Sequence, residues 1–162
     1  MNAAVPIIRA HDQGDRQSFF GGGLHTWKLL AEETQGTFFL FEDALGRGKA
    51  TPFHRHPEAD EMTYVLEGDI VVNVDGKESR VSAGGMSFVP KGTPHAFLVV
   101  SDDARLLTLQ TPGIGQEFYR GASEPTTGAT SETVDIERVR ASAMANPHGV
   151  ELLGPPPFEP ST

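Results

Sequence analysis

The 162-residue chain contains no cysteine. Without thiols the protein forms no disulfide bond, and thiolate metal sites such as zinc fingers and iron–sulfur clusters are excluded. A cysteine nucleophile is excluded for the same reason. The missing residue type thus removes covalent cross-links, thiolate metal centres and thiol catalysis from consideration.

Basic residues are scarce. Lys and Arg number 13 against 22 Asp and Glu, which gives a formal net charge of −9. No basic patch is available to contact phosphates, so nucleic acid and anionic membranes are poor partners. Long apolar runs are also lacking, because no stretch is long enough to span a bilayer and the amino terminus has no signal-peptide core. We expect a cytoplasmic protein with no nucleic-acid or membrane partner.

Glycine and proline, by contrast, are plentiful, at 18 and 12 residues. Between them lie about eight short apolar or alternating segments, separated by turn signals every 8–12 residues or so. Asp75-Gly76 is a strong signal for a two-residue hairpin turn. This pattern predicts an all-β protein built as one antiparallel jelly-roll barrel.

The most informative stretch runs from Gly48 to Gly68 and contains His54, His56 and Glu61. On a β-strand, residues i and i+2 point to the same face, so the two histidines can project into one space. Glu61 has the opposite parity, but the bend through Pro57 can bring it back to the same side. Two imidazoles and a carboxylate are a partial ligand set for a metal ion.

A second stretch, from Gly84 to Val99, adds His95 at the start of an apolar strand after the turn residues Pro90, Gly92 and Pro94. His95 can supply a third imidazole. In spacing and order the two stretches resemble the two cupin motifs, G-x5-H-x-H-x4-E-x6-G and G-x5-P-x-G-x2-H-x3-N. The chain departs from the second motif only at Val99, where the family often has an asparagine that is not a ligand.

The predicted metal ligands are therefore His54, His56, Glu61 and His95. Three neutral imidazoles and one carboxylate suit a divalent transition metal such as Fe, Mn, Co or Ni, and Zn also fits these donors. Glu61 can serve both as a ligand and as a catalytic base that takes a proton from a substrate hydroxyl.

The rest of the pocket is expected to be apolar and to favour a flat aromatic substrate. Phe97 and Val99 share strand parity with His95, and Phe118 and Tyr119 can close the mouth of the barrel. In the two-faced apolar segment 37–41, parity leaves open which pair faces inward. The residues predicted to bind substrate are Phe38, Leu40, Phe97, Val99 and Phe118.

The remaining segments precede and follow the predicted barrel in the sequence. Residues 1–17 are an expected amino-terminal arm, residues 18–120 the barrel, and residues 121–162 a linker, a helix and an extended tail of the same domain. Residues 134–145 have helical spacing, with Ser131 or Thr133 as a possible N-cap, and predict a short helix packed outside the barrel. His25 alternates with apolar neighbours on a predicted strand, a pattern more typical of a structural or surface histidine than of a ligand.

Runs flanking the motifs, over about residues 18–158, are similar to single-domain cupins related to bacterial quercetin 2,3-dioxygenase. The resemblance implies a dioxygenase that uses O2 to cleave the oxygen heterocycle of a flavonol-like substrate and release carbon monoxide, with Glu61 taking the 3-hydroxyl proton. Two alternatives remain open: a non-oxidative metal cupin enzyme (isomerase, cyclase or decarboxylase), and a non-catalytic small-molecule-binding cupin. The two-faced segment 37–41 and the amino-terminal arm suggest a homodimer.

Overall fold

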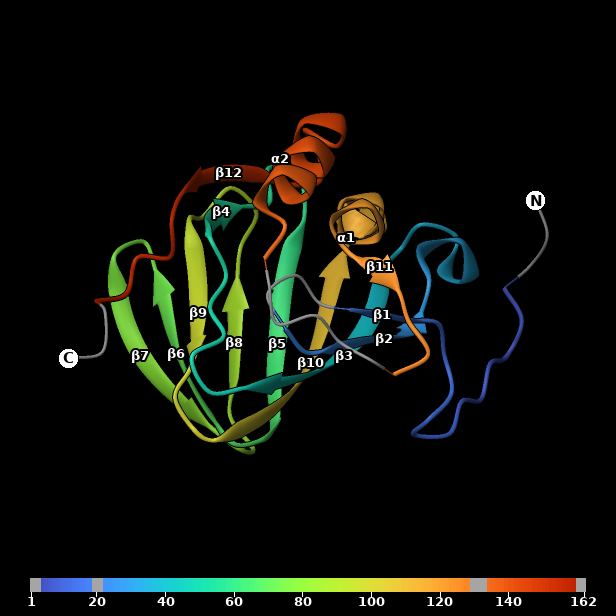
Figure 1. The fold of residues 1–162 in the computed structure, drawn as a ribbon. Helices are drawn as coiled ribbons and strands as arrows, with labels where there is room; N and C mark the ends of the chain where they lie inside the picture. Colours follow the sequence, from blue (N-terminus) through green and yellow to red (C-terminus); the bar gives the residue numbers. More distant parts are fainter. Residues whose placement is uncertain (1–3, 19–21, 129–133, 160–162) are drawn as a thin grey trace.

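The protein was analysed as a computed structural model, which describes residues 4–18, 22–128 and 134–159. The described residues form two antiparallel sheets, one of seven strands in the order β11-β1-β2-β3-β10-β5-β8 and one of five in the order β12-β4-β9-β6-β7 (Figure 1). The strands are β1 (Arg16–Ser18), β2 (Leu24–Leu29), β3 (Phe39–Gly46), β4 (Phe53–Arg55), β5 (Asp60–Glu67), β6 (Asp69–Val74), β7 (Lys77–Ser82), β8 (Met86–Val89), β9 (His95–Val99), β10 (Asp103–Thr111), β11 (Glu124–Pro125) and β12 (Glu151–Gly154). The predicted antiparallel jelly roll is confirmed.

Alternation along the strands decides which side chains enter the barrel. In β10 every second residue is buried, from Ala104 and Leu106 to Thr108 and Gln110. β3 pairs along its whole length with β10 and alternates in the same way, so that Phe39, Phe41, Asp43 and Leu45 are buried. Strand period two thus gives the barrel one inward-facing row for each strand.

The hairpin signal at Asp75-Gly76 also holds. These two residues join β6 to β7 with φ values of 50° and 81°. Positive φ at both central residues is the backbone that a two-residue hairpin turn requires, and Asp-Gly adopts it readily.

Among the described residues, the core consists of two apolar clusters. One fills the barrel interior below the histidines: Leu45, Val65, Ile70, Val72, Val99, Ala104 and Leu106. The other joins the barrel to the helices: Trp27, Phe39, Phe41, Phe118, Tyr119, Ala122, Val139, Ala143 and Val150. The space between the two clusters is where the polar residues of the candidate site lie.

Two helices, α1 (Gln116–Ala122) and α2 (Ile136–Ala145), lie over one end of the barrel beside β12 (Figure 1). The predicted helix at 134–145 is thus confirmed with a later start. Asp135 is the N-cap, and its side chain accepts a hydrogen bond from the Arg138 amide. The N-caps expected at Ser131 or Thr133 lie outside the described residues.

Both chain ends contribute strands. β1 comes from the boundary between the expected arm and the barrel, and β12 comes from the expected extended tail and pairs with β4. The pairing of β12 matters for the site, because β4 carries His54. In the part of the chain described here, no helix has the length and apolar character to cross a membrane.

Candidate metal centre

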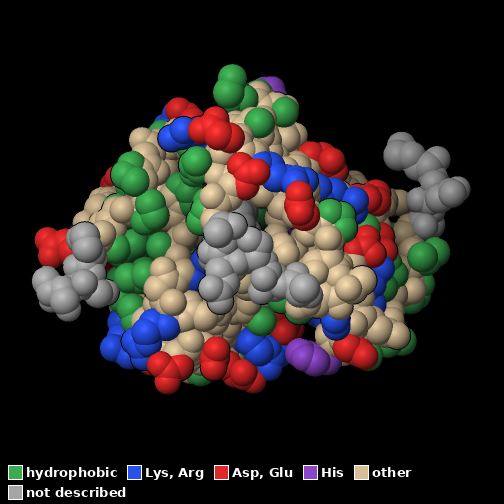
Figure 2. All heavy atoms as spheres, viewed as in Figure 1, with side chains coloured by type: hydrophobic (Ala, Val, Ile, Leu, Met, Phe, Trp, Pro, Cys, Tyr) green, Lys and Arg blue, Asp and Glu red, His purple; other side chains and the backbone are tan. Residues whose placement is uncertain are grey.

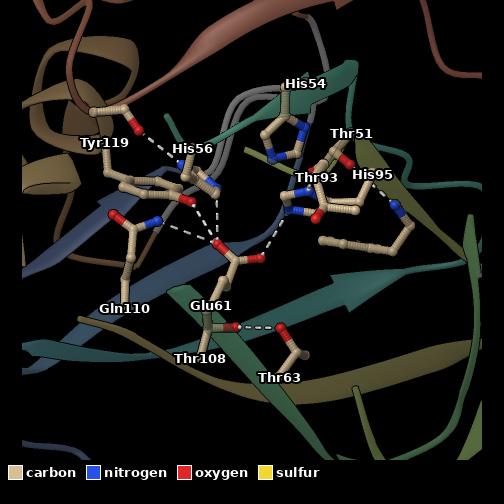
Figure 3. A network of polar contacts seen from close by, with 12 residues as sticks. Thr51, His54, His56, Glu61, Thr63, Thr93, His95, Thr108, Gln110 and Tyr119 are labelled. Atoms are coloured by element: carbon tan, nitrogen blue, oxygen red, sulfur yellow. Dashed lines mark hydrogen bonds and ion pairs between the residues drawn. The ribbon is translucent and has the colours of Figure 1, made fainter. Parts of the chain in front are cut away.

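The four predicted ligands come together at the helix-covered end of the barrel (Figure 3). His54 lies on β4 directly opposite His95 on β9, and His56 follows the end of β4. One ring nitrogen from each of the three histidines lies within 4.8 Å of the others. Glu61, near the start of β5, projects into the same space.

Each imidazole is oriented by a backbone carbonyl. Nδ1 of His54 donates to the Pro52 oxygen at 2.7 Å, Nδ1 of His56 to the Gly149 oxygen at 2.8 Å, and Nδ1 of His95 to the Thr93 oxygen at 3.0 Å. A carbonyl oxygen only accepts, so the proton of each neutral ring is on Nδ1 and the lone pair on Nε2. This is the arrangement in which metal-binding histidines are held.

The carboxylate of Glu61 lies between two of these lone pairs. Its Oε2 is 2.9 Å from Nε2 of His56, and its Oε1 is 3.2 Å from Nε2 of His95. The His56 contact is short, but the buried Nε2 makes no hydrogen bond of good geometry to any described residue. A neutral imidazole with Nδ1 protonated offers only the lone pair of Nε2, and a shared cation satisfies these lone pairs and the carboxylate together, whereas a protonated His95 donates directly to Glu61 Oε1. The donor set and its orientation fit a divalent transition metal.

The pKa values of Glu61 and His54 reflect their burial beside the other titratable groups of the cluster. Burial raises the pKa of Glu61, but the neighbouring His56 and His95 outweigh it and hold the pKa well below the usual value for a glutamate. Burial and the adjacent His95 and His56 lower the pKa of His54 well below its usual value. Glu61 is therefore ionised at neutral pH and His54 is neutral, which are the protonation states that metal ligation needs.

Two further residues orient Glu61. The Tyr119 hydroxyl and the Gln110 Nε2 amide each donate to Glu61 Oε2 at 3.3 Å (Figure 3). Burial, and then the charges of Glu61 and Asp43, raise the pKa of Tyr119 well above its usual value, so the phenol keeps its proton and stays a donor. The sequence placed Tyr119 near the barrel mouth but gave no sign of Gln110. The only available signal was strand parity, which puts Gln110 on the inward row of β10.

A narrow cavity extends from the histidines into the barrel. The centres of water molecules have about 30 Å³ of free space there, enough for about one or two waters. Its lining combines metal ligands, aromatic side chains and hydroxyl or carboxyl groups: Phe41, Asp43, Thr51, Pro52, His54, Glu61, Thr63, His95, Phe97, Thr108, Phe118, Tyr119 and Leu152. The cavity is therefore amphipathic, which sequence parity had not indicated.

Two of the five residues predicted to bind substrate, Phe97 and Phe118, line this cavity. Phe38 precedes β3, and Leu40 points outward from that strand. The expectation that this pair faces the cavity is therefore wrong, and Phe41 lines the cavity instead. Which face of β3 turns inward is set by its pairing with β10, which parity within one strand does not reveal.

Val99 also lies outside the lining. It shares the inward face with His95, as predicted, but it is packed in the lower apolar cluster at 1% exposure. Four strand residues separate the two positions, about 13 Å along the backbone. Strand parity predicted the correct face for Val99, but it does not reveal how deep along the barrel axis the residue lies.

Comparison with known proteins agrees with this architecture. Residues 41–109, less than half of the chain, match the family described as "Cupin domain". It is 28% identical over 127 residues to quercetin 2,3-dioxygenase of Bacillus subtilis, which covers 78% of this chain and 37% of that protein. It is 37% identical over 75 residues to the tetracenomycin polyketide synthase protein TcmJ of Streptomyces glaucescens, which covers 45% of this chain and 50% of that protein.

Solved structures add support for the fold alone. KdgF from Halomonas sp. superposes with a TM-score of 0.61 at 20% identity, covering 67% of this chain and 94% of that one. Oxalate decarboxylase of Bacillus subtilis superposes with a TM-score of 0.53 at 22% identity, covering 61% and 27%. The chain spans half or less of the length of the two sequence relatives described above.

Proposed function

We propose that the protein is a metal-dependent dioxygenase of the quercetinase type, which uses O2 to open the oxygen heterocycle of a flavonol-like substrate. The observation that carries the proposal is the cluster of three imidazoles and one carboxylate, each imidazole fixed by a carbonyl, at the end of an aromatic-walled cavity. The similarity to quercetin 2,3-dioxygenase supports the substrate class.

In this proposal His54, His56, His95 and Glu61 hold the metal ion. A bound divalent transition metal supplies Lewis acidity and a place where substrate and O2 can meet. Glu61 also accepts the proton of the substrate 3-hydroxyl. Its carboxylate is ionised, so it can accept a proton.

Tyr119 and Gln110 keep the carboxylate of Glu61 aimed at that hydroxyl. The aromatic walls formed by Phe41, Phe97 and Phe118 exclude water from the reacting end. A flavonol is larger than the free space in the cavity, so its binding requires lining side chains to move. Phe97 and Leu152 are half-buried lining residues and are the expected moving parts.

The test is oxygen uptake. Metal-free protein is loaded separately with Fe(II), Mn(II), Co(II) or Ni(II), quercetin is added, and O2 consumption is followed together with loss of the flavonol absorption. Uptake matched to flavonol loss, and abolished in His54→Ala, supports the dioxygenase. No uptake with any ion, on protein that holds metal, refutes it.

A non-oxidative metal enzyme acting on a polyketide-like aromatic is the second candidate. The similarity to TcmJ favours it, because that protein belongs to a polyketide synthase. The same four ligands and the same cavity serve this chemistry without O2. Turnover of an aromatic polyketide under strict exclusion of oxygen distinguishes it from the dioxygenase.

We further propose that two copies associate through the outer face of the seven-stranded sheet. On its edge strand β8 and the adjacent β5, the apolar side chains of Tyr64, Met86 and Phe88 are 38%, 48% and 56% exposed. An apolar sheet face beside an open edge is a common site of self-association. Light scattering at micromolar concentration should give a dimer mass for the native chain and a monomer mass for Phe88→Lys. A native monomer refutes the association.

A further inference from the structure

A second carboxyl group lines the same cavity, and strand register places it further into the barrel than the metal ligands. Asp43 on β3 is only 2% exposed, yet it borders the same cavity as Glu61. Strand register places the two groups: Glu61 pairs with Gln110, and Asp43 pairs with Leu106 of the same strand, β10. Four residues of β10 separate these rows, about 13 Å at the level of the backbone.

The carboxyl group of Asp43 is held in place. His25 Nδ1 lies 2.7 Å from Asp43 Oδ1, and both side chains are buried. The His25 ring is itself fixed by Phe41 and Trp27, with centroid distances of 4.2 and 4.7 Å. A carboxylate accepts about four hydrogen bonds, so acceptor capacity remains for a molecule in the cavity.

Apolar neighbours pack against the acid from its own strand and from β10, and the buried cation Lys49 lies close to it. The next inward residue of β3 is Leu45, and the residue paired with Asp43 is Leu106, both in the apolar cluster. A buried carboxyl group costs free energy there, which an apolar residue of similar size would not. Between Asp43 and the metal ligands, the hydroxyls of Thr63 and Thr108 lie 3.2 Å apart and border the same cavity. Polar groups therefore line the cavity from the metal ligands to Asp43.

We propose that Asp43, oriented by His25, is a specificity-determining residue that accepts a hydrogen bond from a phenolic hydroxyl at the end of the substrate remote from the metal. This inference rests on the proposed function and narrows it to planar aromatics that carry a hydroxyl at both ends. A two- or three-ring aromatic that displaces lining side chains such as Phe97 can reach from the metal ligands to Asp43, with one face against Phe41.

The test measures binding without turnover. Protein loaded with Zn²⁺, which is redox-inert, is titrated without oxygen with quercetin and with 3-hydroxyflavone. The second compound keeps the 3-hydroxyl and lacks the remote ones. Asp43→Asn keeps the shape of the side chain but replaces one acceptor oxygen with a donor amide. Asp102→Asn is the matched control. Asp102 is an exposed aspartate that forms an ion pair with Arg47.

In the native chain we expect tighter binding of quercetin than of 3-hydroxyflavone. Asp43→Asn should weaken quercetin binding about tenfold or more, the effect of losing a hydrogen bond to a charged group, and leave 3-hydroxyflavone binding unchanged. Asp102→Asn should behave as the native chain does. Metal content is measured in each variant.

A purely structural role for the Asp43–His25 pair predicts a different pattern. Asp43→Asn would then weaken the binding of both ligands by the same factor, or of neither. If the native chain still takes up O2, either result overturns this inference and leaves the proposed function standing. If the native metal-loaded chain binds neither flavonol, the proposed function fails and the inference fails with it.

Discussion

Lys49, which follows the β3 strand, is a buried cation close to Asp43. It is 7% exposed. Burial disfavours the charged ammonium and lowers the pKa of Lys49 from 10.5 to about 7, although the charge of Asp43 opposes the effect. The stability of the protein should therefore depend on pH through this side chain, and Lys49→Met should remove that dependence.

The sign follows from proton counting. Between about pH 7 and pH 10.5 the unfolded chain keeps the Lys49 proton and the folded chain has released it. The unfolded state then binds more protons, so the free energy of unfolding rises with pH in this window. Below pH 7 the full cost of the buried charge is present. The difference between 10.5 and about 7 corresponds to about 5 kcal/mol at 1.36 kcal/mol for each pKa unit.

The assay is denaturant unfolding of the native chain and Lys49→Met across the range from neutral to alkaline pH. The difference in unfolding free energy between the two should change by about 1.4 kcal/mol for each pH unit above neutrality, in favour of the native chain as pH rises. Lys77→Met, at an exposed lysine on β7, is the control, and its unfolding free energy should depend on pH as that of the native chain does. A difference between Lys49→Met and the native chain that stays flat with pH would refute the reasoning.

Four further predictions concern the site and its support. Metal at a hundredfold excess over its Kd should raise the free energy of unfolding by about 2.7 kcal/mol; calorimetry should show this gain lost in His54→Ala and kept in His148→Ala, an exposed histidine 76% open to solvent. Glu61→Gln should abolish turnover and retain part of the metal by elemental analysis, and a fully active variant would contradict its role as the base. Tyr119→Phe should lower kcat/KM about fivefold by removing one hydrogen bond worth about 1 kcal/mol, and an unchanged value would show that the hydroxyl does not orient Glu61. Leu106→Ala, at a fully buried position, should cost about 2–5 kcal/mol in denaturant unfolding, whereas a loss below 1 kcal/mol or so would mean that the lower cluster repacks.

The sequence indicated the proposed ligand set because the relevant information is local. His54 and His56 share a strand face, Glu61 follows a proline bend, and His95 opens a strand after a turn. Backbone geometry converts those spacings into directions, so the grouping of the three histidines was predictable, whereas the pairing of His54 with His95 was not. The antiparallel barrel was predictable for the same reason, since turn residues and alternation act over a few residues.

What the tertiary structure decided depends on contacts between distant segments. The carbonyl that orients His56 belongs to Gly149, 93 residues further along the chain. The inward face of β3 and the depth of Val99 follow from strand pairing and position along the barrel axis. The acid at the floor of the cavity, Asp43, and its partner His25 meet because β2 and β3 are in register. By itself the sequence determined which residues can bind a metal. Only the packed barrel determined what surrounds that metal, because cavity walls are made by strands whose register and depth no local pattern records.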